Sequence, residues 1–197
     1  MDQSKYLSNF FLSASIPSPE RDERFYETAD IIAIREAIKA LSMIVIPKVN
    51  LVWGGHPSIT PLIRYILAQM NVEIKKHVTL YQSLYYEEKF PIENTYFEHI
   101  VFTPKSMTLK DSIRNMRISM IKDNDFKAGV FIGGMEGVLE EYELFKQFHP
   151  TVKVFPIAST GGASKILYQK LNPRLDTRLI SDYAYVPLFR DLFANIL

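Results

Sequence analysis

The stretch VFIGGMEGVLEE, residues 130–141, decides the fold class. Its apolar first half is typical of a buried strand, and the pair Gly133 and Gly134, followed by Gly137, marks a tight turn into a helix. The same change from a short apolar run to helical spacing recurs along the whole chain. This alternation predicts an α/β domain with a mostly parallel sheet.

The pattern predicts five to six strands with helices on both faces of the sheet. Strands are expected at residues 10–15, 50–53, 77–82, 99–103, 126–132 and 152–158, with a short additional strand at 43–46. Helices are expected at about 28–41, after a cap at Ser58 or Thr60, from Thr108 onward, from the glycine turn to 148, and at 163–171 and 186–197. We expect one domain over residues 1–197, in which 172–197 form an extension that packs on the core or on a partner subunit.

The composition excludes several classes of protein. With 23 basic and 22 acidic side chains, the chain has no bulk charge to attract a nucleic acid polymer. It contains no cysteine, and no run approaches the roughly 18 apolar residues of a membrane helix. His77, His99 and His149 show no spacing typical of a metal site. We therefore expect a cytoplasmic protein without membrane association, metal or cofactor.

Five loops are expected to meet at one edge of the sheet, because the carboxyl ends of parallel strands share an edge and ligands bind there. Three of these loops carry paired glycines, which either free helix-start amides for an anion or simply permit tight turns. Arg21 and Arg24 can clamp a phosphate or pair with neighbouring acids. The candidate ligand-binding residues are Ser13, Ser15, Arg21, Arg24, Gly54, Gly55, Tyr81, Gln82, Gly133, Gly134, Met135, Gly137, Glu141, Ser159, Thr160, Gly161 and Gly162.

The carboxylates after the glycine turn change the expected ligand. Glu136 and Glu140 can share one helix face, with Glu141 turned about 100° away, and each can instead simply cap the helix start. A carboxylate repels phosphate, but it accepts hydrogen bonds from ribose hydroxyls and can stabilise an oxocarbenium-like cation. The loop therefore favours a nucleoside or nucleotide sugar, with Glu140, Glu136 and His56 as catalytic candidates.

These motifs together resemble the SLOG superfamily of Rossmann-like domains, which includes the Lonely Guy phosphoribohydrolases. The resemblance rests on the glycine turn with its two glutamates, an early strand ending in small polar residues, and GG after the second core strand; in element order it spans residues 10–171. It implies a Rossmann-like three-layer sandwich. It also implies a nucleotide pocket in which Gly133, Gly134 and Gly137 lie near phosphate and Glu140 or Glu141 lies toward the ribose.

The glycine turn departs from the phosphoribohydrolase pattern, which is GG, one residue, GT, two residues and E. Here there is one additional residue, and Val138 replaces the threonine. This departure indicates a divergent sensor or deoxyribohydrolase-like branch. We expect a homo-oligomer that binds a nucleotide or nucleotide-derived ligand, with amides of Gly134 and Gly161 holding phosphate. It would act as a sensor in stress or antiviral signalling or, alternatively, as an N-glycosidase that cleaves the base–sugar bond.

Overall fold

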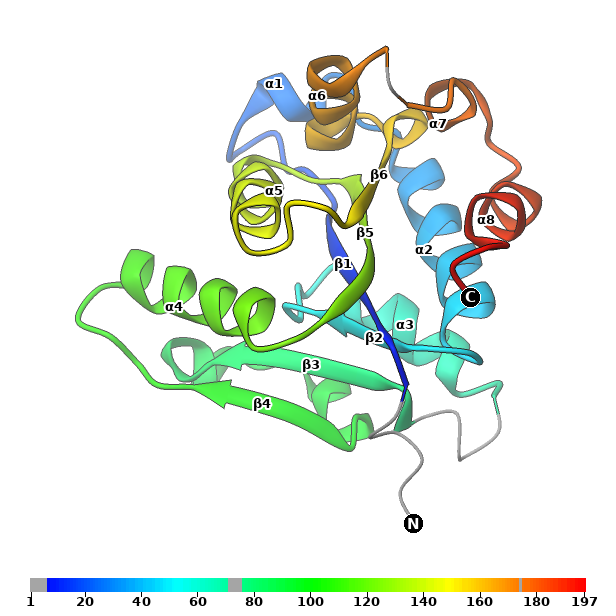
Figure 1. Ribbon diagram of the computed structural model, residues 1–197. Coiled ribbons are helices and arrows are strands. Elements are labelled where there is room, and N and C mark those ends of the chain that lie inside the picture. The colour runs from blue at the N-terminus through cyan, green and yellow to red at the C-terminus, as the bar shows by residue number, and fades with distance from the viewer. Residues whose placement is uncertain (1–6, 71–75, 174) are drawn as a thin grey trace.

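A computed structural model describes residues 7–70, 76–173 and 175–197 of the chain. Within these ranges six strands form one sheet in the order β4-β3-β2-β1-β5-β6, and all neighbouring strands are parallel. The strands are β1 (Asn9–Ser15), β2 (Asn50–Trp53), β3 (Val78–Ser83), β4 (His99–Thr103), β5 (Phe126–Gly133) and β6 (Lys153–Ile157) (Figure 1). The predicted α/β class with a parallel sheet is confirmed.

The strand order reverses beside β1. From β1 the chain adds β2, β3 and β4 on one side, and it then crosses to place β5 on the other side. The register aligns Ser15 with Gly133, so β1 and β5 end together at the same edge of the sheet. A crevice for a ligand is expected at such a switch point.

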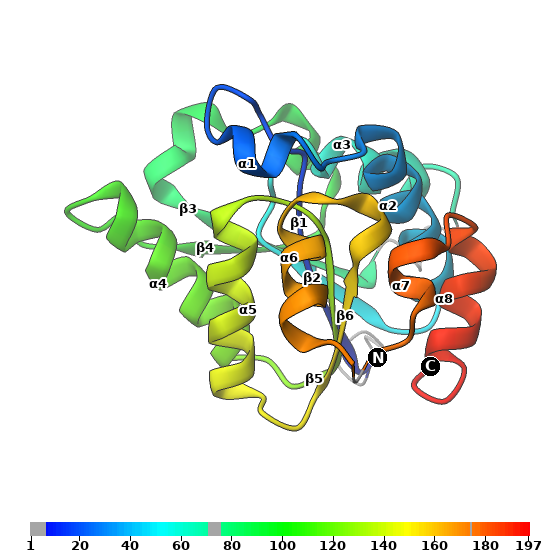
Figure 2. The same cartoon turned by 90° about the horizontal axis from the view of Figure 1, so that it is seen from above.

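Helices cover both faces of the sheet (Figures 1 and 2). The helices α2 (Ile31–Val45), α3 (Thr60–Leu67) and α8 (Tyr185–Phe193) contribute to one core cluster, and α4 (Leu109–Lys122) and α5 (Glu136–Phe148) contribute to the other. α6 (Gly162–Leu171) adds residues to both clusters. The shorter helices are α1 (Glu23–Tyr26), α7 (Arg178–Ser181) and the 3-10 segments η3 (Leu84–Lys89), η4 (Ile92–Tyr96) and η5 (Ala158–Thr160). The result is the predicted Rossmann-like three-layer arrangement.

The central strand β1 shows why the apolar runs lack strict alternation. Phe10 and Leu12 belong to the cluster under α2, whereas Phe11 belongs to the cluster under α5 and stacks on Phe145 with a centroid distance of 5.2 Å. A strand covered on both faces must be apolar at consecutive positions.

The ends of three helices show where the predicted element boundaries agree with the structure and where they do not. The helix α4 begins at Leu109, next to its predicted start, and Thr108 caps it, because the Thr108 hydroxyl accepts a hydrogen bond from the Asp111 amide at 3.1 Å. The helix α2 continues through Val45, so the predicted short strand at residues 43–46 is wrong; Val45 extends the buried stripe of the helix. The predicted cap of α3 by Ser58 or Thr60 is also wrong, since α3 begins at Thr60 without a side-chain cap.

The C-terminal helix α8 lies against α2 and completes one face of the core. Phe189 and Phe193 are fully buried, and Phe193 meets Phe10 edge-on at 5.2 Å. Residues 185–193 therefore contribute to the same apolar core as the central strand. Among the helices in the described ranges, none has the length and apolar character needed to cross a bilayer.

Candidate functional site

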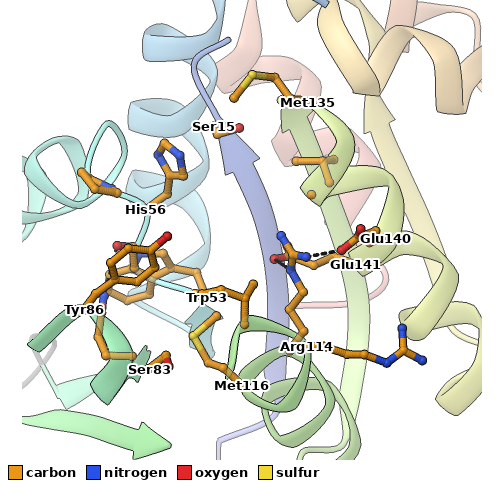
Figure 3. A pocket seen from close by; sticks show the side chains of 18 of the residues that line it. Ser15, Trp53, His56, Ser83, Tyr86, Arg114, Met116, Met135, Glu140 and Glu141 are labelled. Atoms are coloured by element: carbon orange, nitrogen blue, oxygen red, sulfur yellow. Dashed lines mark hydrogen bonds and ion pairs between the residues drawn. The ribbon is translucent and has the colours of Figure 1, made fainter. Parts of the chain in front are cut away.

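A pocket of about 920 Å³ opens at the carboxyl edge of the sheet, at the switch point (Figure 3). It is lined by loops that follow β1, β2 and β3, by the first turns of α4 and by the start of α5. Eleven of the predicted site residues line it: Ser15, Arg21, Gly54, Gly55, His56, Gln82, Met135, Glu136, Gly137, Glu140 and Glu141. The others, namely Ser13, Arg24, Tyr81, Gly133, Gly134, Ser159, Thr160, Gly161 and Gly162, lie outside the lining.

The glycine pair at the end of β5 connects this strand to β1 and to η5 by hydrogen bonds. Gly133 and Gly134 have φ values of 57° and 85°, a region that favours glycine. The Gly134 amide donates to the Ser15 carbonyl at 2.8 Å, and the Gly133 amide donates to the Thr160 hydroxyl at 2.9 Å. Both amides are therefore engaged within the protein, and the expected phosphate contact from the Gly134 amide is not supported. The segment that faces the pocket is the following one, residues 135–137, where the first amides of α5 lack intrahelical acceptors.

The glycines of the loop at residues 159–162 likewise have a structural role. The Gly161 amide donates to the Ala158 carbonyl at 3.0 Å, and the Gly162 amide donates to the Thr28 hydroxyl at 3.1 Å. A Cβ atom on Gly161 would lie 1.8 Å from the Thr28 carbonyl oxygen. The glycines thus allow close approach of the chain around Thr28, and the expected phosphate contact from the Gly161 amide is not supported.

Of the three glutamates, Glu141 is the one held in a fixed position at the pocket. Its carboxylate accepts a hydrogen bond of 2.6 Å from the hydroxyl of the buried Ser13 and one of 3.1 Å from Arg117 Nε. The Glu141 side chain is 13% exposed, against 53% for Glu140 and 65% for Glu136. Arg117 also pairs with Glu140, whereas Glu136 pairs with Arg24 at 3.1 Å. Ser13 therefore does not line the pocket itself but helps to fix the orientation of Glu141, which does.

His56 is held as a neutral imidazole. The Ser58 backbone amide donates to His56 Nδ1 at 3.3 Å, so Nδ1 is an acceptor and the ring hydrogen is placed on Nε2. The Ser58 hydroxyl lies 2.8 Å from Nδ1 and accepts from the Ile16 amide, which leaves its own hydrogen for Nδ1. Burial, with the nearby charges of Arg21 and Arg117, lowers the pKa of His56 from 6.5 to about 4. His56 therefore offers the pocket an N–H donor, and its charged form is disfavoured as a proton source near neutral pH.

Of two further predicted residues, Gln82 lines the pocket and Tyr81 does not. Gln82 Nε2 donates to the Gly55 carbonyl at 3.1 Å and holds the turn at Gly55, whose φ is 62°. Tyr81 is buried, and its hydroxyl accepts from Asn124 at 2.9 Å. Trp53 is 2% exposed and meets Phe97 edge-on at 5.0 Å, so it belongs to the core, although it also borders the pocket.

Several lining residues have no counterpart among the predicted ones. These are chiefly cations and apolar side chains from η3, its exit and α4: Tyr86, Lys89, Phe90, Leu109, Lys110, Ile113, Arg114 and Arg117. The spacing of Arg114 and Arg117, three apart on the helix after β4, was the available signal. The lining carries five Lys or Arg and three Glu, a formal excess of two positive charges. Among the described residues, no carboxylate forms an ion pair with Arg21, Lys89 or Lys110.

The part of the chain that the structure describes contains no group of three or more His, Cys, Asp or Glu side chains able to hold a metal ion. The polar groups at the pocket are instead one fixed carboxylate, one imidazole donor, a helix start and unpaired cations. This set suits a ligand that has both hydroxyl groups and anionic groups.

Comparisons with known proteins place the chain in a family. The X-ray structure of TM1055, a target of a structural genomics consortium, has a similar fold, with a TM-score of 0.54 and 15% identity over 88% of this chain and 89% of that one. No curated protein matches the sequence. A protein-family model described as the SLOG cluster3 family matches residues 24–193, which include the pocket residues from β2 to α5. The predicted family is thereby confirmed: the chain belongs to the SLOG cluster3 family.

Proposed function

We propose that the pocket binds a nucleotide or a nucleotide-derived ligand of the nucleotide-sugar type, and that the protein acts as a cytoplasmic sensor in stress or antiviral signalling. The observation that carries the proposal is the position of Glu141, a carboxylate fixed by Ser13 and Arg117 beside the start of α5. Ribose hydroxyls would donate to Glu141, and the amides of residues 135–137 with Arg21 would receive phosphate. His56 Nε2–H would donate to an acceptor on the ligand.

A second candidate is hydrolysis of the base–sugar bond, and the same carboxylate favours it. The two contacts to Glu141 hold it in one orientation, as needed to stabilise or attack a cation developing at C1′. Glu140 is more exposed and pairs with Arg117 through one contact, so Glu141 is the stronger catalytic candidate. His56 would assist as a neutral hydrogen-bond donor to the leaving base, because its lowered pKa disfavours the imidazolium.

Binding is tested by thermal denaturation with AMP, dAMP, NAD⁺ and ADP-ribose. A ligand at 100 times its Kd adds about 2.7 kcal/mol to the unfolding free energy, which corresponds to a rise of roughly 5–10 °C in Tm for a chain of this size. Glu141→Gln should reduce that rise. Glu143→Gln is the matched control, because Glu143 lies on the same helix, is exposed and does not line this pocket. A flat Tm with every nucleotide would contradict the proposal.

Hydrolysis is tested on the same samples by chromatography of released base. Release that is lost in Glu141→Gln and retained in Glu140→Gln would support the second candidate. If the wild type at high protein concentration binds a nucleotide and releases no base, the hydrolysis candidate is excluded and the sensor proposal remains.

A further inference from the structure

The pocket has two chemically different ends. The polar end consists of Ser15, His56, residues 135–137 and Glu141 and lies beside β1, β2 and β5. The other, which we call the aromatic end, consists of Tyr86, Phe90, Leu109 and Ile113 and lies beside β3 and β4. Figure 3 shows Tyr86 on the opposite side of the pocket from Glu140 and Glu141. A ligand that used only the polar end would leave this second wall uncovered.

The aromatic end presents apolar surface to the pocket. Tyr86 is 36% exposed and Leu109 is 40% exposed, although both line a concave site. Phe90 also stacks on Phe102, at a centroid distance of 5.8 Å with 28° between the ring planes. Side chains on η3 and on the first turns of α4 thus line the pocket, and their apolar faces can contact a flat ring.

Cations accompany these apolar side chains. Lys89 adjoins Phe90 and Lys110 adjoins Leu109, and both lysines line the pocket. Within the described part of the chain neither has an ion-pair partner, unlike Arg117, whose charge is matched by Glu140 and Glu141. The aromatic end therefore combines a surface for stacking with unpaired positive charge. Proteins that bind single-stranded nucleic acids use the same combination, in which aromatic side chains stack on the bases and cations contact the phosphates.

We propose that the aromatic end is a second subsite, which takes a second nucleobase joined to the first nucleotide through an anionic phosphate linkage. This proposal rests on the proposed function, in which the polar end holds the first nucleotide. The volume of about 920 Å³ is near the upper limit of the roughly 300–1,000 Å³ usual for small-molecule pockets, which favours a dinucleotide over a single nucleotide. Tyr86 stacks the second base, and Lys89 and Lys110 neutralise the linkage.

The test compares three ligands by titration calorimetry: AMP, ADP-ribose, and diadenosine diphosphate, in which two adenosines flank the diphosphate. The last two share the diphosphate and differ chiefly in the second base. Stacking is worth about 1–3 kcal/mol per base, so diadenosine diphosphate should bind roughly 5- to 150-fold more tightly than ADP-ribose. Tyr86→Ala should abolish this difference and leave the AMP affinity unchanged, whereas Tyr86→Phe should preserve it.

Tyr65→Ala is the matched control, because Tyr65 is 58% exposed on α3 and does not line the pocket. Its affinities should equal those of the wild type. Equal affinity of the wild type for ADP-ribose and diadenosine diphosphate would overturn the second subsite while the proposed function stands. Loss of AMP affinity in Tyr86→Ala would also overturn it, because Tyr86 would then belong to the first site. Failure of all three ligands to bind would overturn both proposals.

Discussion

Acidification should destabilise the fold through His56. The folded protein lowers the pKa of this imidazole from 6.5 to about 4, mainly by burial. Between these two values the unfolded chain binds a proton that the folded chain does not, so stability is lost as the pH falls from 6.5 to 4. At about 1.4 kcal/mol per pKa unit, the full loss is about 3–4 kcal/mol, of which about 3 kcal/mol is reached at pH 4. Above pH 6.5 both states are neutral at this site and the contribution is constant.

Urea denaturation of the wild type and of His56→Gln between pH 7.5 and pH 4 measures this loss. Glutamine cannot become protonated, so the difference between the two unfolding free energies isolates His56 from the carboxylates, which titrate in both proteins. The difference should change by about 3 kcal/mol across this range, to the disadvantage of the wild type at low pH. Parallel curves of unfolding free energy against pH for the two proteins would refute the assignment of His56 as a partly buried neutral donor.

Two further predictions follow from the packing and a third from the pKa of His56. Gly161→Ala should lower the unfolding free energy in urea by about 2–6 kcal/mol, because the φ of Gly161 is 71° and the new Cβ would overlap the Thr28 carbonyl. Gly54→Ala should be tolerated, since its Cβ would meet Met116 at an ordinary 3.4 Å. Equal losses in the two variants would contradict this account. Phe193→Ala should cost about 3–5 kcal/mol, and Tyr183→Ala, at an exposed position, should stay within about 0.5 kcal/mol; a small loss for Phe193 would show that α8 is not part of the core. Nucleotide affinity should be constant between pH 6 and 8 if His56 binds as a neutral donor, and a titration in that range attributable to His56 would oppose it.

The positions of the strands and of the edge loops could be predicted from the sequence. Short apolar runs are visible without knowledge of any contact, as at residues 50–53 and 99–103, which the structure assigns to β2 and β4 as expected. The first run is largely buried, whereas the second forms an edge strand that is partly exposed. The rule for parallel sheets then places the following loops at one edge. This is why residues as distant in sequence as Arg21, His56 and Glu141 line one pocket.

Whether each loop binds a ligand or only supports the fold could not be predicted. A glycine at a helix start looks the same in the sequence whether its amide is free or engaged, and the partner of the Gly162 amide, Thr28, is 134 positions away. The choice among the glutamates likewise depends on Arg117, whose direction is set by how α4 lies against α5. Both features arise from packing between distant segments, which local spacing does not encode.

The central claim is that a nucleotide binds at the start of α5 beside residues 54–56, and amide chemical-shift mapping of the isotopically labelled protein tests it most directly. On titration with ADP-ribose, the largest shifts should fall on Gly54, Gly55 and His56 and on residues 135–137, while Gly161 and Gly162, whose amides are engaged inside the protein, should change little. Shifts centred on Gly161 and Gly162, or no shifts with any nucleotide tested, would contradict the account.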